Sequence, residues 1–462
     1  MQEIASPRPR DRASSAANLP SNFVTLNSLP SSKPQQDFSG YREFTSELQM
    51  LTVAPKIAGD QAKRVEACLD GTAGAELRRL VGVETRRAQG VFFTGSKLAK
   101  KLVGSVTFNP LKHFVYDPAV GAGDLLLAVA RRLPRARNLR STLKAWGGCL
   151  AGTDIQPEFV EAAKFRLALL ARQLHGGIEK LPQGWRKLFP SIRVGDGLRQ
   201  RNLYARATHI VMNPPFSTSE PAGDCGWKGG RTSDAAMFVI RALERSEPGT
   251  LLIAVLPDVL RSGSFQHQWR ERVSDLAEVC SVKHHGIFDD FADVDVFRLD
   301  LVRRAGTDAK LRRWPKPRVR AKGTIGDYFD VHVGRVVPHR DDESGPLRRY
   351  IHPRNIPVWQ EVTRISEKRQ HEGLAYQPPF VVLRRTSRPG HPYRAAATVI
   401  LGTRPVAVEN HLIVCEPHNK SADTCRALME QLHTQQVNKF LDQRIRCRHL
   451  TVGAVEGIPF ML

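Results

Sequence analysis

The sequence predicts an α/β fold in which a doubly wound, mostly parallel sheet ends in a β-hairpin and is followed by an α+β domain. Between about residues 114 and 304, short apolar runs alternate with amphipathic stretches of helical period. Such runs are typical of buried parallel strands, and strands that alternate with helices indicate βαβ units. A break at 303–322, dense in Arg, Lys and Pro, indicates a domain boundary.

The elements follow from these patterns. Strands are expected at 114–116, 148–152, 208–212 and 251–255, and helices at 124–132, 157–173, 233–245 and 265–277. The last strands, near 278–284 and 295–302, have no helical pattern between them, which predicts the hairpin. We divide the chain into a disordered basic arm (1–40), an α/β domain with an N-terminal helical segment (41–305), a linker (306–322) and a C-terminal α+β domain (323–462).

Composition narrows the possible partners. The 462 residues include 69 Lys and Arg against 46 Asp and Glu, and the resulting charge of +23 suits a polyanion. Aromatic residues make up only 7%, which argues against a single-strand binder built on stacking platforms. The seven cysteines show no metal-ligand spacing, so no metal is expected. No apolar run approaches the roughly 18 residues of a membrane helix, so we expect a cytoplasmic protein without a membrane partner.

A glycine turn follows the first predicted strand, in the sequence Asp-Pro-Ala-Val-Gly-Ala-Gly-Asp at 117–124. Gly121 and Gly123 would allow a ligand to approach the backbone at the carboxyl edge of the sheet. Two glycines alone are a weak signal, because many tight turns contain them.

Two acidic residues follow the next strands. Asp154 ends the second strand, where its carboxylate could accept hydrogen bonds from both hydroxyls of a ribose. The alternative is an N-cap for the helix from Pro157, although Asp154 lies slightly early for that role. Asp196, followed by Gly197, could hold an exocyclic adenine amine, but Asp-Gly is also a common turn.

The most specific cluster is Asn213-Pro214-Pro215-Phe216, directly after the strand at 208–212. Two prolines forbid continuation of the strand and stiffen the backbone around the asparagine. The side-chain oxygen of Asn213 and the carbonyl of Pro214 could accept both N–H bonds of an amine. These acceptors would favour an sp³ nitrogen with an available lone pair.

These motifs resemble those of N6-adenine DNA methyltransferases. The turn at 117–124 resembles their methionine-binding motif DPAxGxGxFL, and 213–216 resembles their catalytic motif (N/D)PP(Y/F). Residues 90–95, Gly-Val-Phe-Phe-Thr-Gly, resemble the GxYYTP motif that covers the cofactor. This motif precedes the glycine turn, which is the order of the gamma class of TaqI-like and type I modification enzymes. Residues 256–260 and 288–291 match later elements.

The sequence departs from the family pattern at two places. Asp124-Leu125 replaces the usual Thr/Ser/Asn-Phe pair, and Gly95 replaces the usual proline.

The resemblance implies a Rossmann-like methyltransferase that uses S-adenosyl-L-methionine. The residues implied to bind this cofactor are Phe93, Thr94, Asp117, Ala119, Gly121, Gly123, Asp154, Ile155, Asp196, Gly197 and Asn213. Catalysis is assigned to Asn213, Pro214, Pro215 and Phe216. An adenine inside a duplex must flip out to react. We expect Phe216 to stack on one face of the base and Phe291 on another, with Phe288 a rival for the second role and core packing an equal alternative for either.

The C-terminal region loosely resembles the target-recognition segments of TaqI-like enzymes and type I specificity subunits, at 324–334, 350–356 and 449–459. Arg384, Arg385, Arg388 and Arg394 are candidate contacts to phosphate or guanine, although such charges more often form a solvated face. The implied partners are double-stranded DNA and a separate restriction endonuclease or defence-system subunit.

Alternative functions are an RNA adenine methyltransferase, a protein glutamine methyltransferase and a catalytically silent DNA-binding subunit. The intact Asn213-Pro214-Pro215 sequence argues against the silent subunit. The basic C-terminal region argues against the glutamine methyltransferase.

Overall fold

The structure is a computed structural model that describes residues 38–220, 231–289, 292–306, 314 and 322–462. Almost all of the predicted arm at 1–40, and most of the predicted linker at 306–322, lie outside these residues. Among the described residues, no helix has the length and apolar character needed to cross a bilayer.

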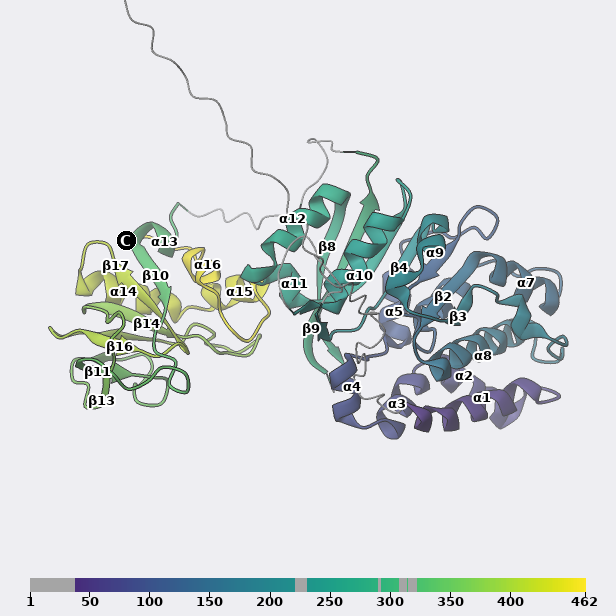
Figure 1. Ribbon diagram of the computed structural model, residues 1–462, viewed down its shortest axis with the longest axis horizontal. Coiled ribbons are helices and arrows are strands. Elements are labelled where there is room, and N and C mark those ends of the chain that lie inside the picture. Colours follow the sequence, from purple (N-terminus) through teal and green to yellow (C-terminus); the bar gives the residue numbers. More distant parts are fainter. Residues whose placement is uncertain (1–37, 221–230, 290–291, 307–313, 315–321) are drawn as a thin grey trace, which may run out of the picture. The chain divides into compact units, whose positions relative to one another are not determined.

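A seven-stranded sheet forms the centre of the α/β region, with the strand order β3-β2-β1-β4-β7-β9-β8. Its parallel strands are β1 (Val115–Asp117), β2 (Leu150–Asp154), β3 (Ile192–Val194), β4 (His209–Met212) and β7 (Leu251–Pro257). The long strands β8 (Ala277–Asp289) and β9 (Ala292–Arg303) pair antiparallel, and β9 also pairs antiparallel with β7. The doubly wound sheet with a terminal hairpin is therefore confirmed (Figure 1).

Alternate residues of each strand enter two apolar cores, one on each face of the sheet. Val115 and Val211 pack into the first core, whereas their neighbours Tyr116 and Ile210 pack into the second. The helices of the first core include α5 (Gly95–Val103), α6 (Asp124–Ala130), α7 (Leu139–Cys149) and α8 (Pro157–Leu174). The helices of the second core are α9 (Arg201–Arg206), α10 (Asp234–Arg245), α11 (Asp258–Ser262) and α12 (His267–Leu276).

Three N-terminal helices join the first core, namely α1 (Arg42–Val53), α2 (Gly59–Leu69) and α3 (Thr72–Leu80), and α4 (Val83–Gln89) follows them. Two fully buried arginines of α8 satisfy carbonyls at the ends of these helices, which have no partner within the helix itself. Arg166 Nε donates to the carbonyl of Cys68 at 2.8 Å, and Arg172 Nη2 donates to that of Ala54 at 3.0 Å.

The C-terminal region contains two sheets with its own apolar cores. The five-stranded sheet has the order β10 (Phe329–Val333), β17 (Leu412–Pro417), β14 (Phe380–Arg384), β15 (Ala397–Ile400) and β12 (Glu361–Val362). The three-stranded sheet has the order β13 (Lys368–Gln370), β11 (Leu347–Ile351) and β16 (Val406–Val408).

Four helices accompany these sheets: α13 (Ile325–Tyr328), α14 (Ala422–Leu432), α15 (Gln435–Arg444) and α16 (Val452–Glu456). One core lies between the helices and the five-stranded sheet. A second core is formed by residues of both sheets, such as Val382 and Val408. The predicted α+β character of this region is confirmed.

Candidate active site

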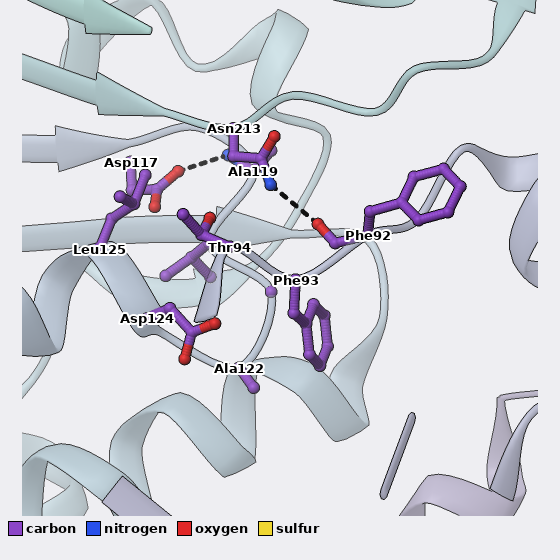
Figure 2. Close-up of a pocket in the computed structure, with 11 residues that line it drawn as sticks. Phe92, Phe93, Thr94, Asp117, Ala119, Ala122, Asp124, Leu125 and Asn213 are labelled. Carbon is purple, nitrogen blue, oxygen red and sulfur yellow. Dashed lines mark hydrogen bonds between the residues drawn. The ribbon is translucent and has the colours of Figure 1, made fainter. Parts of the chain in front are cut away.

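A pocket lies at the carboxyl edge of the central sheet, where β1 and β4 end (Figure 2). It is lined by Phe92, Phe93, Thr94, Asp117, Ala119, Val120, Gly121, Ala122, Asp124, Leu125 and Asn213. Three segments far apart in sequence therefore meet here: residues 92–94, the glycine turn and the asparagine after β4. The pocket brings together six of the residues predicted from sequence to bind the cofactor, namely Phe93, Thr94, Asp117, Ala119, Gly121 and Asn213.

The glycine turn is shaped by backbone geometry that only glycine adopts easily. Gly121 has φ +50° and Gly123 has φ +86°, both in the left-handed region. A Cβ atom on Gly121 would lie 3.0 Å from the ring of Phe93, and one on Gly123 would lie 3.0 Å from Ala163. The turn therefore packs closely against residues on both sides.

Asp154 connects the end of β2 to this turn. Its Oδ2 accepts a hydrogen bond from the backbone N–H of Gly121 at 3.0 Å, and its Oδ1 accepts one from Gln156 at 3.0 Å. Gln156 is the N-cap of α8, so Asp154 does not occupy the capping position. The neighbouring Ile155 is 57% exposed, an unusual setting for an isoleucine. The ribose contact remains a prediction.

The turn after β3 lies against the turn after β1. A Cβ atom on Gly197 would lie 1.9 Å from the carbonyl oxygen of Pro118, so this close approach requires glycine. Asp196 Oδ1 accepts from the backbone N–H of Leu198 at 2.8 Å, and Asp196 forms an ion pair with Arg199. Asp196 therefore forms the turn contact that was the alternative interpretation. Neither Asp196 nor Gly197 lines the pocket, and the adenine contact remains a prediction.

The side chain of Asn213 is fixed at one end only. Its Nδ2 donates to the carbonyl of Phe92 at 2.8 Å (Figure 2), whereas its Oδ1 is buried and has no hydrogen-bond partner among the described residues. Pro214 is buried, and Pro215 is half-buried.

The loop after Asn213 lies directly against the segment before Phe92. The backbone N–H of Phe216 donates to the carbonyl of Gly90 at 3.1 Å. Gly90 has φ +62°, and a Cβ atom on it would lie 2.2 Å from the nitrogen of Ser217. A side chain at position 90 would push the two segments apart.

Asp234, which the sequence analysis did not identify, holds this loop from the other side. Its carboxylate accepts hydrogen bonds from the hydroxyls of Ser217 and Ser219, and its backbone N–H donates to the carbonyl of Ser217 at 3.0 Å. The flanking strands β5 (Thr218–Ser219) and β6 (Thr232–Ser233) pair antiparallel. The sequence signal was only an acidic residue in the first turn of α10, which is common in any helix.

Three aromatic rings pack together beside Asn213. The ring centroids of Phe216 and Phe288 are 5.6 Å apart, and Phe92 lies 5.9 Å from Phe216 and 6.2 Å from Phe288. Phe291, the residue predicted to stack on the second face of the base, lies outside the described residues. Phe288, its rival in the sequence analysis, contacts Phe216 directly.

Two carboxyls at this edge of the sheet have raised pKa values. The pKa of Asp117 is raised to about 8, mainly by burial and to a lesser extent by the nearby carboxylates of Asp154 and Asp124, while the Ala119 N–H lowers it. Burial also raises the pKa of Asp154 to about 6. A bound cation would stabilise the charged form of both groups.

The C-terminal arginines differ in their settings. Arg394 is fully buried and donates to the carbonyls of Ile445 and Cys447, so it supports the fold and is not exposed for a phosphate or a base. Arg384 and Arg385 each donate to a backbone carbonyl, and Arg388 is exposed.

Residues 78–282, which include every segment of the pocket, match the family model described as N-6 DNA methylase. The matched segment is less than half of the chain. The match confirms the resemblance inferred from the motifs. No match was found among the curated proteins.

Solved structures of restriction–modification proteins are similar to this chain at low sequence identity. The type IIL restriction–modification enzyme MmeI, solved in complex with DNA, is 12% identical with a TM-score of 0.50, over 84% of this chain and 70% of MmeI. A modification subunit assigned to a type I restriction enzyme from Vibrio vulnificus YJ016 is 18% identical with a TM-score of 0.36, over 49% of this chain. This chain covers 48% of that subunit, about half of its length.

Proposed function

We propose that this protein is a site-specific DNA methyltransferase that transfers the methyl group of S-adenosyl-L-methionine to the N6 amine of adenine in double-stranded DNA. The observation that carries the proposal is the unpartnered Oδ1 of Asn213 at the edge of the pocket. Leaving a buried acceptor without a partner costs about 1–3 kcal/mol, so a ligand that supplies a donor there would bind favourably. The N–H of an adenine amine is such a donor.

The residues of the pocket fit the proposed cofactor. The glycine turn exposes backbone without a Cβ atom, which allows close approach of a ligand, and the carboxyls of Asp117 and Asp154 nearby would ionise beside a bound cation. We propose that the pocket-lining Phe93, Thr94, Asp117, Ala119, Gly121 and Asn213 hold the cofactor, with Gly123, Asp154, Ile155, Asp196 and Gly197 around them. When bound, S-adenosyl-L-methionine would supply an electrophilic methyl group on a sulfonium.

The protein residues would then make the amine reactive. The lone pair of an adenine amine is delocalised into the ring, so the amine is a poor nucleophile. The Oδ1 of Asn213 and the carbonyl of Pro214 would accept its two N–H bonds and favour a nitrogen with an available lone pair. Since Phe92 fixes the Nδ2 of Asn213, the orientation of the acceptor is set before the substrate arrives.

The target base must leave the duplex to reach this pocket. We propose that it stacks on Phe216, which stands three residues after Asn213. The second face is assigned to Phe291 or Phe288, and the observed contact with Phe216 favours Phe288.

The remaining parts of the proposal concern the partners. The charge of +23 suits DNA, and we propose that residues 323–462 select the site within it. The family match and the motif order support a role in restriction–modification or phage defence, with a separate endonuclease or defence subunit as partner.

The test uses the full chain with radiolabelled S-adenosyl-L-methionine and, in separate reactions, unmethylated duplex DNA, RNA and protein extract. The expected result is label in DNA, recovered as N6-methyladenine after digestion to nucleosides. Asn213→Ala should remove this label. Label in RNA or in protein alone, or equal labelling by Asn213→Ala, would contradict the proposal.

A further inference from the structure

The two positions where the sequence departs from the methyltransferase motifs contact each other. The backbone N–H of Gly95 donates a hydrogen bond to Oδ2 of Asp124 at 2.9 Å. The proline that is usual at position 95 has no N–H to donate. Gly95 also has φ +67°, which a proline cannot adopt. The two departures are therefore the two halves of one interaction.

A fully buried arginine completes this interaction. Arg166 Nη1 donates to Oδ1 of Asp124 at 2.8 Å and to the carbonyl of Ala122 at 2.6 Å, while its Nε donates to the carbonyl of Cys68. The side chain of Asp124 is 7% exposed and that of Arg166 is 0% exposed. A buried ion pair gains little stability over apolar residues, so its retention needs a reason beyond stability.

The geometry around Asp124 supplies such a reason. Residues 92–95, which we call the strap, provide Phe92, Phe93 and Thr94 to the lining of the pocket, and Asp124 lines the same pocket. The ring of Phe93 lies over Gly121, and its centroid is 5.0 Å from that of the Phe159 ring. The hydrogen bond from Gly95 to Asp124 therefore ties the strap to the glycine turn.

We propose that Asp124 is a positioning residue that, held by Arg166, latches the strap over the cofactor pocket and slows release of S-adenosyl-L-methionine. The inference rests on the proposed function, because it assigns the latch to the cofactor named there. Both oxygens of the Asp124 carboxylate are used, one by each partner, so a neutral Ser or Thr could not make both contacts and balance the charge of Arg166.

The chain contains a matched control for a purely structural role. Arg172 lies on the same helix as Arg166, is 1% exposed, and also donates to backbone carbonyls, those of Leu51, Thr52 and Ala54. It does not line the pocket. Arg172→Gln should therefore reduce stability without affecting the strap.

The first experiment compares the full-length parent with Asp124→Ser, Arg166→Gln and Arg172→Gln. The dissociation constant and dissociation rate of radiolabelled S-adenosyl-L-methionine are measured well below the melting temperatures. Loss of a charge-assisted hydrogen bond is expected to raise both by about tenfold in Asp124→Ser and Arg166→Gln. Arg172→Gln should lower the melting temperature and leave the dissociation constant and the dissociation rate within about twofold of the parental values. An equal effect in all three variants would overturn the proposal.

A double variant separates folding from latching. Asp124→Ser leaves Arg166 buried without its counter-charge and can lower stability strongly. Asp124→Ser/Arg166→Met removes both charges, so its melting temperature should recover toward that of the parent. Its cofactor affinity should stay about tenfold weaker, because the strap is still untied. Recovery of affinity together with stability would contradict the latch.

A third measurement needs no cofactor. Hydrogen exchange of the Gly95 amide should be slow in the parent and in Arg172→Gln and fast in Asp124→Ser. If the parent does not bind S-adenosyl-L-methionine, the proposed function fails. If the Gly95 amide exchanges fast in the parent, the latch itself does not exist, whatever the result of the binding measurement. Protection of Gly95 in Asp124→Ser would also overturn it.

Discussion

The carboxylate of Asp154 and the backbone N–H of Gly121 form a hydrogen bond of 3.0 Å, which joins the ends of two neighbouring strands across 33 positions of sequence. The residue predicted to bind a ribose is therefore also the residue that shapes the glycine turn. Its second oxygen accepts from Gln156, at the start of α8. Substitutions at Asp154 should affect the turn itself as well as any ligand.

Asp154→Ala should lower the free energy of unfolding by about 1–3 kcal/mol, because it leaves the N–H groups of Gly121 and Gln156 without their acceptor. Asp154→Asn keeps one acceptor oxygen and should lose less. Urea denaturation of the two variants and the parent measures the difference. Equal stability of all three would show that the two hydrogen bonds do not support the turn.

Asn213→Ala should abolish methyl transfer while leaving cofactor binding nearly intact, because it removes the acceptor for the amine and little of the pocket wall. Removal of one such electrostatic group typically costs a factor of about 10² to 10³ in rate. The turnover number and the dissociation constant of S-adenosyl-L-methionine are measured on the same preparations. Asn213→Asp retains an acceptor but cannot donate to the carbonyl of Phe92, and it should be intermediate at best. A parental rate in Asn213→Ala would refute the assigned role.

The cofactor-free protein should lose stability as the pH rises from about 4 to about 8. The pKa of Asp117 is raised to about 8 and that of Asp154 to about 6, whereas the pKa of an aspartate in an unfolded chain is about 3.9. The folded state therefore binds more protons than the unfolded state within this window, and raising the pH favours unfolding. Denaturation curves at pH 5 and pH 8.5 test this, and Asp117→Asn should weaken the dependence. A steeper dependence in that variant would contradict the assignment to Asp117.

Cofactor affinity should change with pH in the opposite direction. The sulfonium charge of S-adenosyl-L-methionine favours ionised carboxylates, so its binding should tighten between pH 6 and 8 as protons are released. S-adenosylhomocysteine, which lacks the sulfonium charge, should show a weaker dependence. Calorimetry in buffers of different ionisation enthalpy measures the released protons directly. Identical pH profiles for the two ligands would exclude this electrostatic account.

Removal of the residues after about Lys322 should destroy the choice of site without preventing cofactor binding. The C-terminal region has apolar cores of its own, including Val381 and Val382 on opposite faces of one strand, so its loss leaves the cores of the α/β region intact. Sequencing of modified adenines identifies the methylated sites. Methylation of the same sites by the truncated enzyme would disprove the domain assignment.

DNA affinity of the full chain should fall steeply with salt.

The sequence predicted the sheet and its terminal hairpin because strand and helix periods are local properties of the chain. It also located the glycine turn and the asparagine after β4, since both motifs are short and continuous. It could not predict that Phe92 fixes Asn213, because the acceptor is a backbone carbonyl 121 positions away and any residue has one. The link between Gly95 and Asp124 was missed for the same reason, although each had been noticed as a departure.

The second aromatic residue could not be chosen from sequence either. Phe288 and Phe291 stand three positions apart in the sequence, and of the two only Phe288 belongs to the described residues. The face on which Phe288 lies depends on the local register, and the pairing of β8 with β9 shifts between Ile287 and Asp289. A shift of one residue turns every following side chain to the other face. Irregular pairing of this kind cannot be predicted from the order of apolar and polar residues.

Asp234→Ala should reduce the turnover number without weakening cofactor binding, because Asp234 contacts the loop after Asn213 and does not line the pocket. Asp234 is 9% exposed and its carboxylate accepts from two serine hydroxyls, so its loss frees the segment that carries Phe216.

Ser219→Ala removes one of the two hydroxyl donors and should have a smaller effect than Ser217→Ala. The reason is that Ser217 directly follows Phe216, and its hydroxyl also reaches the carbonyl of Gln89. Single-turnover kinetics and cofactor binding, measured on the three variants, distinguish a loosened loop from a damaged pocket. If Asp234→Ala weakened cofactor binding as much as it slowed transfer, the loop would not be the element that Asp234 positions.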